Sequence, residues 1–323
     1  MPDSSDTTRS SVNGFLNFYK STGMTSMDAL RRIKRITGQR QKVGHAGTMD
    51  PLAKGVLPIC FGQATRLMEH ILDGPKRYRV EIELGATTST YDAEGEVVKI
   101  GDPGNITRED IETCLVQFIG LTEQTPPMYS AIKVNGQRLY KLARAGIEIQ
   151  RNARPVEIYD IQIEDMALPR VVLVVECGRG VYIRSLAHDL GQALGCGGYV
   201  TNLVRQSSGG FWVGESITLE QLEAACETSS GWQSLLYPID WVLRELRSIT
   251  VTPHAEQYLS HGQSVSLGRD GHDAGYLEQF RAYTSDGRFL ALVRCDRWAQ
   301  AWRPVKVFQI DTPSPYAAAS SRV

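Results

Sequence analysis

The sequence predicts an α+β protein in which one mixed β-sheet with helices is followed by a small β-rich second domain. Segments with strand and helix patterns interleave, but without the regular spacing that repeated βαβ units produce. After about Ser248 the pattern changes to short β-like runs around a Gly- and Asp-rich turn at 268–275. We therefore expect a disordered lead-in at 1–13, a main domain at 14–248, a second domain at 249–311 and a flexible tail at 312–323.

Strand patterns recur along the main domain. Residues 77–84 alternate apolar and charged side chains, which is the period of a strand with one buried face. Shorter apolar runs predict further strands at 14–19, 56–61, 156–163 and 171–177, and in the second domain at 289–293 and 305–310.

Helices are predicted where apolar residues recur at three-residue spacing behind a start signal. Thr25 and Asp28 form a capping-box pattern, and the apolar positions from Met27 to Ile36 follow it. Further helices are expected at 65–72, 110–119, 138–145 and 182–194, the last ending at Gly195.

Composition indicates an ordinary globular protein, with 42% hydrophobic and 22% charged residues among 323. No segment approaches the ~18 to 20 consecutive apolar residues that a membrane span needs, and the Ser/Thr-rich start has no apolar core of a signal peptide. The six cysteines form no Cys-x-x-Cys pair, so we expect reduced thiols and no zinc site. The cytoplasm is the simplest location.

The net charge is only −1, but positive residues are segregated into two runs. One spans 31–42 and the other 133–154. Each run is explained either as a solvated helix face or as part of a positive surface for a phosphate backbone. The two explanations stay open until both runs are placed on one surface. The basic residues are Arg31, Arg32, Lys34, Arg35, Arg40, Lys42, Lys133, Arg138, Lys141, Arg144, Arg151 and Arg154.

Several common catalytic motifs are missing from the sequence. It has no Walker loop, no Gly-x-Gly-x-x-Gly after a strand and no His-Glu-x-x-His. Nucleotide-driven and metalloprotease chemistry therefore have no support, and we expect neither a metal nor a cofactor. Glycoside hydrolysis needs a pair of carboxylates, and it is disfavoured because the candidate catalytic residue Asp50, described below, has no second carboxylate at the spacing of such a pair.

Residues 44–55 form a glycine-bracketed loop that contains His45 and the pair Asp50-Pro51. Glycines permit backbone angles closed to other residues, and proline keeps the preceding residue out of the helical region. The loop is therefore built to present the Asp50 carboxylate. From spacing alone, an ordinary turn in which the aspartate bonds its own backbone is the favoured explanation.

The segment Gly-His-Ala-Gly-Thr-Met-Asp-Pro-Leu-Ala-Lys-Gly-Val-Leu, with Phe-Gly-Gln-Ala-Thr-Arg-Leu at 61–67, resembles the catalytic motif of the bacterial tRNA pseudouridine-55 synthases (TruB type). The resemblance implies a pseudouridine synthase fold for 14–248 and isomerisation of uridine 55 in the tRNA T loop without a cofactor. It also makes Asp50 the catalytic carboxylate. Whether Asp50 attacks the base or the sugar, or assists loss of the base, is left open.

A second motif, Gly-Arg-Gly-Val-Tyr-Ile-Arg-Ser-Leu-Ala-His-Asp-Leu-Gly at 178–191, also resembles the family. The resemblance pairs Arg184 with Asp50 and places Tyr182 in the same pocket. The pairing is physically reasonable, because a buried carboxylate protonates unless a cation keeps it charged, and arginine grips a carboxylate at two points. The alternative for Arg184 is a surface salt bridge at a helix start.

The remaining site residues follow from the resemblance alone. It implies that Tyr78 stacks on the flipped base and takes part in proton transfer, and that Leu203 packs against the base. It makes His45 a wedge that helps to displace the uridine. Lys20 and Gly23 match an early family pattern whose Asp and Pro are absent here. Core packing is the alternative for Tyr78 and Leu203.

The C-terminal segment resembles a PUA-like RNA-binding domain, which implies contact with the acceptor end of tRNA. The expected partner is therefore the T arm of tRNA, with no membrane and no obligate protein partner or guide RNA. A guide-dependent synthase of the dyskerin kind is one rival. A non-catalytic tRNA-binding or tRNA-folding protein is the other.

Overall fold

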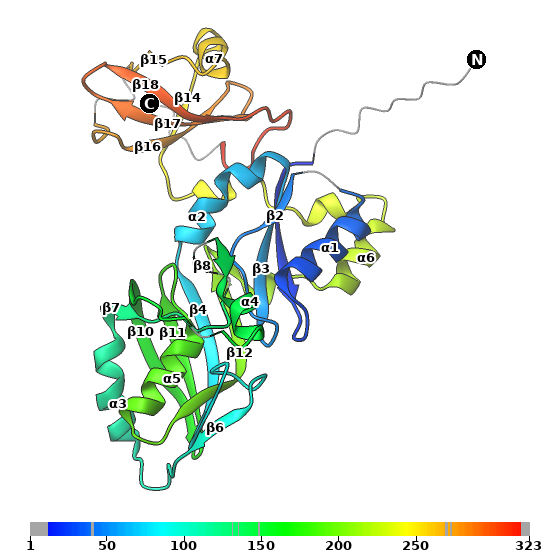
Figure 1. Ribbon diagram of the computed structural model, residues 1–323. Coiled ribbons are helices and arrows are strands. Elements are labelled where there is room, and N and C mark those ends of the chain that lie inside the picture. Colours follow the sequence, from blue (N-terminus) through cyan, green and yellow to red (C-terminus); the bar gives the residue numbers. More distant parts are fainter. Residues whose placement is uncertain are drawn as a thin grey trace.

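The computed structural model describes residues 12–39, 42–130, 132–134, 136–147, 149–268, 271 and 273–317. The lead-in expected at 1–13 therefore lies almost wholly outside the described residues. The main domain is built on a nine-stranded sheet in the order β1-β3-β12-β4-β11-β10-β7, with β2 paired to β3 and β13 to β12 (Figure 1).

The sheet is mixed, as predicted, because β12 runs parallel to β3 while the other described pairs within it are antiparallel. Its strands are β1 Gly14–Lys20, β2 Val43–His45, β3 Lys54–Phe61, β4 Lys76–Leu84, β7 Gly120–Gln124, β10 Arg154–Ala167, β11 Arg170–Cys177, β12 Gly198–Ser208 and β13 Phe211–Trp212.

Strand β4 confirms the expected alternation, since Val80, Ile82 and Leu84 are buried and the charged residues between them are only partly covered. Strand β12 was not predicted, although it lies between β3 and β4 at the centre of the sheet. The reason is that β12 buries polar side chains, Arg205 and Ser208, at positions where an apolar residue would signal a strand.

Helix α1 (Ser26–Thr37) begins with the predicted capping box between Thr25 and Asp28 and ends at Gly38 in the left-handed conformation. Of the apolar positions that predicted this helix, Leu30 and Ile33 are buried, whereas Met27 is exposed. The other helices are α2 Met68–Asp73, α3 Arg108–Leu115, α4 Leu139–Arg144, α5 Ile183–Ala193, α6 Leu219–Cys226 and α7 Pro253–Ser260. Helices α6 and α7 were not predicted.

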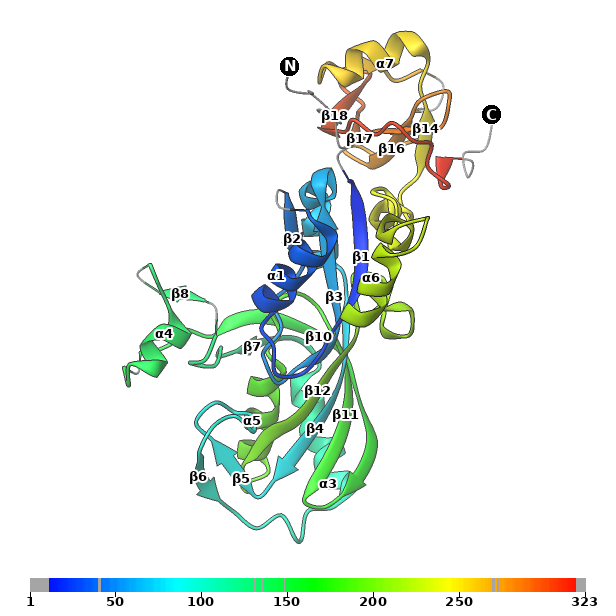
Figure 2. The ribbon, with the colours of Figure 1, turned by 90° about the vertical axis from the view of Figure 1, so that its right-hand side faces the viewer.

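Short elements complete the main domain: β5 Ala86–Thr88, β6 Val97–Ile100, β8 Lys133–Val134, β9 Gln137–Arg138, η1 Gly62–Leu67, η2 Val116–Phe118, η3 Val213–Glu215, η4 Trp232–Leu235 and η5 Trp241–Leu243. The segment that carries β8, β9 and α4, which we call the arm, projects from the sheet (Figure 2). In Figure 2 it lies on the same side of the sheet as α1. The elements that carry most of the two basic runs, α1 and the arm, therefore lie on one side of the sheet.

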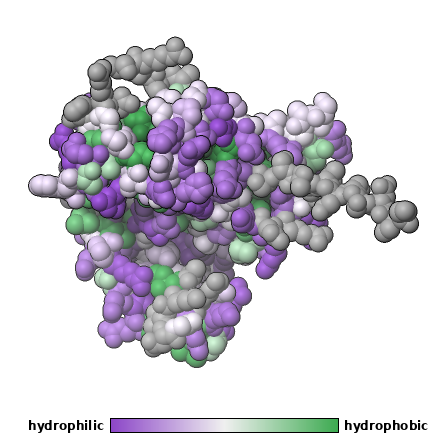
Figure 3. All heavy atoms as spheres, turned by 90° about the horizontal axis from the view of Figure 1, so that it is seen from above, coloured by the Kyte–Doolittle hydropathy of each residue, from purple (hydrophilic) through white to green (hydrophobic). Residues whose placement is uncertain are grey.

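A second sheet forms the C-terminal domain, in the order β14-β16-β17-β18-β15 (Figure 1). Its strands are β14 Ser248–Thr250, β15 Val265–Ser266, β16 Gln279–Tyr283, β17 Phe289–Asp296 and β18 Ala301–Val307. The predicted β-rich character is confirmed, although β18 begins earlier than the apolar run at 305–310 suggested. Because β14 starts at Ser248, we keep 248 as the proposed domain boundary. Viewed from above, the coloured surface carries many hydrophilic residues with hydrophobic ones scattered among them (Figure 3).

The two domains share one hydrophobic cluster. Phe15 and Trp241 of the main domain pack in it together with Phe289 and Phe308 of the C-terminal domain. Asp240 adds a polar contact by accepting a hydrogen bond of 2.6 Å from the Tyr283 hydroxyl. The first part of the expected tail also joins this contact, since the Ser314 hydroxyl donates to Asp240 at 2.5 Å. The described part of the tail, up to Ala317, therefore packs against the body of the protein.

None of the helices in the described part of the chain has the length and apolarity needed to cross a membrane. The six cysteines are free thiols, of which Cys226 is exposed and Cys60, Cys177, Cys196 and Cys295 are buried.

Candidate active site

Asp50 lies in the loop between β2 and β3, and contacts at the start of α1 fix this loop. The backbone amide of Met49 donates to the Ser26 hydroxyl at 2.8 Å, and the Gly23 amide donates to the Pro51 carbonyl at 2.9 Å. Gly47 and Gly55 flank the loop with φ of 97° and 108°, which an L side chain rarely adopts. The expected carboxylate-presenting loop is therefore present as a well-anchored structure.

Arg184 grips the Asp50 carboxylate at two points. Its Nε donates to Oδ2 at 2.9 Å, and its Nη2 donates to Oδ1 at 2.8 Å. The arginine comes from the first turn of α5, which packs against β12 and β4. Because the Arg184 side chain is only 3% exposed, the alternative of a surface salt bridge is excluded. The Asp50 side chain remains 33% exposed, so one side of it is accessible to a ligand.

A second carboxylate holds Arg184 from the other side. Arg184 Nη1 lies 3.3 Å from Asp92 Oδ2, and Asp92 is 2% exposed. Arg184 also donates to the carbonyl oxygens of Thr90 at 3.0 Å and Tyr129 at 2.8 Å. Sequence reasoning did not single out Asp92, because an aspartate in a turn carries no signal of its own.

The electrostatics of Asp50 depend on two opposing effects. Burial raises the pKa of the carboxyl, while the Arg184 guanidinium, through its charge and its hydrogen bonds, opposes the rise. The charge of Asp92 adds to the rise, and that of Lys20 reduces it. Ionised Asp50 therefore depends on the cations beside it.

Lys20 ends β1 beneath the loop and is fully buried. Its ammonium group donates to the carbonyl oxygens of Met24 at 2.7 Å, Ser21 at 3.1 Å and Pro51 at 3.3 Å. Burial lowers the pKa of Lys20 to about 8, although the nearby Asp50 charge favours the protonated form. Lys20 thus links the Asp50 loop to the start of α1.

The two expected aromatic residues lie close enough to Asp50 to sense its charge. Tyr78 lies on β4, and burial raises the pKa of its phenol while Arg205 opposes the rise. Tyr182 caps α5, and burial followed by the Asp50 charge raises its pKa. Gln124 fixes the Tyr182 backbone by accepting from its amide at 2.7 Å and donating to its carbonyl at 3.0 Å.

His45 ends β2, and Leu203 lies on β12. Among the described residues His45 Nδ1 is buried without a hydrogen-bond partner, and burial followed by Arg205 lowers its pKa, so the ring is neutral at pH 7. Leu203 is buried in the main hydrophobic cluster together with Met49 of the Asp50 loop. Core packing and contact with a bound base are both compatible with this position.

Arg205 is the other site residue that sequence reasoning missed. It is 2% exposed and contacts both ends of the Asp50 loop. Its Nε donates to the Val56 carbonyl at 2.7 Å, and its Nη2 donates to the Gly47 carbonyl at 3.2 Å. An arginine inside an unrecognised strand gives no signal in sequence, since its usual place is the surface.

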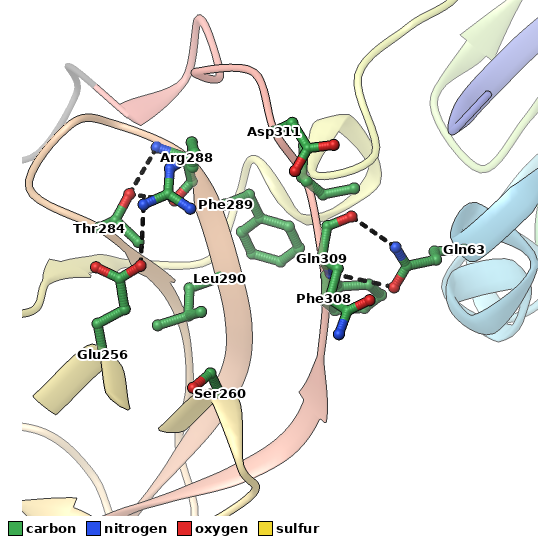
Figure 4. Close-up of a pocket in the computed structure, with 11 residues that line it drawn as sticks. Gln63, Glu256, Ser260, Thr284, Arg288, Phe289, Leu290, Phe308, Gln309 and Asp311 are labelled. Carbon is green, nitrogen blue, oxygen red and sulfur yellow. Dashed lines mark hydrogen bonds and ion pairs between the residues drawn. The ribbon is translucent and has the colours of Figure 1, made fainter. Parts of the chain in front are cut away.

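A pocket of about 340 Å³ lies elsewhere, between the C-terminal domain and η1 (Figure 4). Arg288 is its conspicuous cation, but it is paired with Glu256 at 2.9 Å and with Asp286 at 2.7 Å. The side-chain amide of Gln63 donates a hydrogen bond of 2.7 Å to the Gln309 carbonyl. None of the residues that line this pocket belongs to the Asp50 site, so we place the candidate active site at Asp50.

Two family models match adjoining parts of the main domain. A model described as TruB family pseudouridylate synthase (N terminal domain) matches residues 34–183. A model described as tRNA pseudouridylate synthase B C-terminal domain matches residues 184–244. A protein of Dehalococcoides mccartyi named tRNA pseudouridine synthase B is 40% identical over 95% of this chain and 100% of its own. The chain belongs to the TruB family of tRNA pseudouridine synthases. The resemblance seen in the motifs is thereby confirmed.

Two further relatives support the same family assignment. A tRNA pseudouridine synthase B of Clostridium perfringens is 40% identical over 88% of this chain and 96% of its own, and one of Clostridium acetobutylicum is 41% identical over 87% and 95%. This TruB-family chain is therefore an isomerase. The pairing of Asp50 with Arg184 joins the regions matched by the two family models.

Solved structures show the same fold. A chain of the Cbf5-Nop10-Gar1 complex matches with a TM-score of 0.69 at 24% identity, covering 94% of this chain and 86% of its own. A chain of an H/ACA RNP bound to a substrate RNA containing 2'-deoxyuridine matches with a TM-score of 0.68 at 22% identity and the same coverage. The expected fold around a mixed sheet is therefore confirmed.

Proposed function

We propose that this TruB-family protein converts uridine 55 in the T loop of tRNA to pseudouridine, with Asp50 as the catalytic carboxylate. The observation that carries the proposal is the two-point contact of the buried Arg184 guanidinium with Asp50. It keeps a negative charge in a partly covered site where an isolated carboxyl would take up a proton. The named relatives are tRNA pseudouridine synthases, and the T-loop position is what we infer beyond them.

The reaction is an isomerisation, and its demands match the residues present. The bond between N1 of uracil and C1′ of the ribose breaks, and a bond between C5 and C1′ forms. The proton on C5 leaves, and N1 gains one, so no oxidant, reductant or hydrolytic water is consumed. A partly exposed carboxylate can act as nucleophile or stabilise positive charge. The partial exposure of the Asp50 side chain supports either role.

Base flipping is the second part of the proposal. A uridine stacked in the T loop must leave its neighbours before Asp50 reaches it, at a cost of a few kcal/mol. We assign His45 the role of wedge in the vacated space, because its neutral ring lies next to the Asp50 loop. Tyr78, Tyr182 and Leu203 would line the pocket for the detached base, and Lys20 would support the loop. Stacking on an aromatic ring is worth about 1 to 3 kcal/mol per base.

The proposed partner is the T arm of tRNA, held by basic residues of α1 and the arm, two elements that lie on one side of the sheet. Arg32 and Arg35 on α1, and Lys141 and Arg144 on α4, are exposed, and none of the four forms an ion pair with another described residue. Unpaired surface cations attract a phosphate backbone. Guide RNA, protein partners and a compartment other than the cytoplasm are not required by this proposal.

The test is tritium release from tRNA that carries 5-tritiated uridine, because C5 loses its hydrogen when C5 binds C1′. We expect release by the unsubstituted protein and none by Asp50→Asn, with tRNA binding retained. A transcript with cytidine at position 55 should give no release. Release by Asp50→Asn would remove Asp50 from the mechanism, and binding without release by either protein would favour a tRNA-binding protein or a guide-dependent enzyme.

A further inference from the structure

Arg205 is a buried cation in an unusual environment. Among the described residues, no carboxylate forms an ion pair with its guanidinium, although the side chain is almost completely buried. Burying a charge without a countercharge costs free energy, and an apolar side chain would fill a core position at lower cost. The charge and shape of Arg205 therefore call for an explanation other than core packing.

The strand pairing places Arg205 between the two parts of the site. Its Cα is paired with that of Gly55 on β3, just after the Asp50 loop, and with that of Tyr78 on β4. Directly opposed residues on neighbouring antiparallel strands project to the same face of the sheet. The guanidinium accordingly lies close enough to the Tyr78 phenol to oppose the effect of burial on it.

The loop closes tightly around this side chain. Arg205 donates to the carbonyl of Gly47 before Asp50 and to that of Val56 after it, so one guanidinium ties together both ends of the loop. A Cβ added to Gly55 would lie 2.3 Å from the Arg205 carbonyl oxygen, and one on Gly47 would lie 3.3 Å from Arg205 Nη1. These two glycines therefore leave room for the arginine.

We propose that Arg205 is a positioning residue for the isomerisation, which sets the Asp50 loop and the Tyr78 hydroxyl relative to each other from beneath. The planar fork of arginine is required because it bonds two carbonyl oxygens in different directions while presenting charge to a third group. Lysine would keep the charge, but its single nitrogen cannot occupy the positions of both Nε and Nη2, from which Arg205 reaches the two carbonyl oxygens. The kinetic part of this inference rests on the proposed function, and the structural part does not.

The structural test uses amide hydrogen exchange of the full-length protein. Arg205→Lys should speed exchange in the peptide that spans 44–56 and leave β1 unchanged. Lys76→Met is the matched control, because Lys76 is also a buried cation that donates to backbone carbonyls, those of Leu72 and, at 2.6 Å, Gly74, and within the described part of the chain none of its hydrogen bonds reaches the Asp50 loop. Unchanged exchange over 44–56 in Arg205→Lys, or an equal increase in Lys76→Met, would overturn the proposal.

The kinetic test is a double-mutant cycle with Tyr78→Phe, read as single-turnover tritium release at saturating protein. Arg205→Lys should lower the rate about tenfold while the Kd for tRNA changes less than about twofold. The factor by which Arg205→Lys lowers the rate should be at least about threefold smaller in the Tyr78→Phe background, because the hydroxyl that Arg205 positions is gone. Equal costs in both backgrounds would overturn the link to Tyr78. Absence of release by the unsubstituted protein would instead count against the proposed function, leaving the exchange result to decide the structural part.

Discussion

Arg184 Nη1 lies 3.3 Å from the Asp92 carboxylate, and both side chains are almost completely buried. Asp92 is itself held, since its Oδ1 accepts from the Thr90 hydroxyl at 2.5 Å and from the Glu94 amide at 3.1 Å. Arg184 thus has one carboxylate partner inside the protein and a second, Asp50, at the accessible edge. The arginine is oriented before any substrate arrives, so its geometry need not be assembled during the reaction.

We expect Asp92→Ala to destabilise the protein by about 3 kcal/mol, because it removes the buried carboxylate that compensates the charge of the buried Arg184 guanidinium. It should also lower the rate of tritium release, since Arg184 can then turn away from Asp50. Urea unfolding measures the first effect. Asp102→Ala is the matched control: Asp102 is also a loop carboxylate that accepts from a backbone amide, that of Gly104 at 2.9 Å, but it is exposed. Equal stability of the two variants would contradict the structural role of Asp92.

Arg184→Lys should slow the reaction about 10- to 100-fold, because an ammonium group cannot reproduce the two-point contact and a lost charge-assisted hydrogen bond is worth about 1.5 to 3 kcal/mol. Tritium release with saturating tRNA is the measurement. Arg179→Lys is the control from the same segment, an exposed arginine paired with Glu69 at 2.7 Å and Asp73 at 2.9 Å. A similar loss in both variants would show that the effect does not come from the contact with Asp50.

Lys20→Met should move the acid limb of the pH-rate profile to higher pH. The active form of Asp50 is taken to be ionised, so activity falls as the pH drops through its pKa. The Lys20 charge lowers that pKa, and its removal therefore raises it. Because the pKa of Lys20 is about 8, the difference between the variants should shrink above pH 8, where wild-type Lys20 also loses its proton. Arg170→Met, a surface change on β11, should leave the limb in place.

Removing two cations from the arm should weaken tRNA binding in a salt-dependent way. For Lys141→Ala combined with Arg144→Ala, the slope of log K against log salt should fall by about 1 to 2 if both contact phosphates. Filter binding at several salt concentrations gives the slope. The control pair is Arg108→Ala with Arg170→Ala, two surface arginines already paired with Glu112 and Asp165 at 2.7 and 2.6 Å. An unchanged slope for the arm variant would separate the arm from RNA binding.

The strength of local signals explains which elements were predictable. The start of α1 was visible because Thr25 and Asp28 lie three residues apart and bond each other's backbone. Strand β4 was visible because one face of it is apolar and the other charged. Helix α6 was missed although Thr218 and Gln221 form a capping box of the same kind. Strand β12 was missed for a different reason, because it buries Arg205 and Ser208.

The residues of the candidate site also differ in whether the sequence could reveal them. Asp50 and Arg184 lie 134 residues apart and were paired in advance only through two motifs that resemble one family. Asp92 and Arg205 contact this pair and its loop, yet neither has a spacing or a neighbour that distinguishes it from a surface residue. Their roles follow from their burial and from the groups that they contact in the folded protein.

By itself, the sequence determined that a glycine-bracketed loop carries Asp50, where α1 starts, the α+β class and the family of the protein. These depend on glycine and proline geometry, on capping and on periodicity, which act over a few residues. Only the tertiary structure decided that Arg184 lies between two carboxylates and that Arg205 ties both ends of the loop beside Tyr78. Such contacts arise where β12, β4 and α5 converge, and the free energy of a buried charge depends on partners that are distant in the chain.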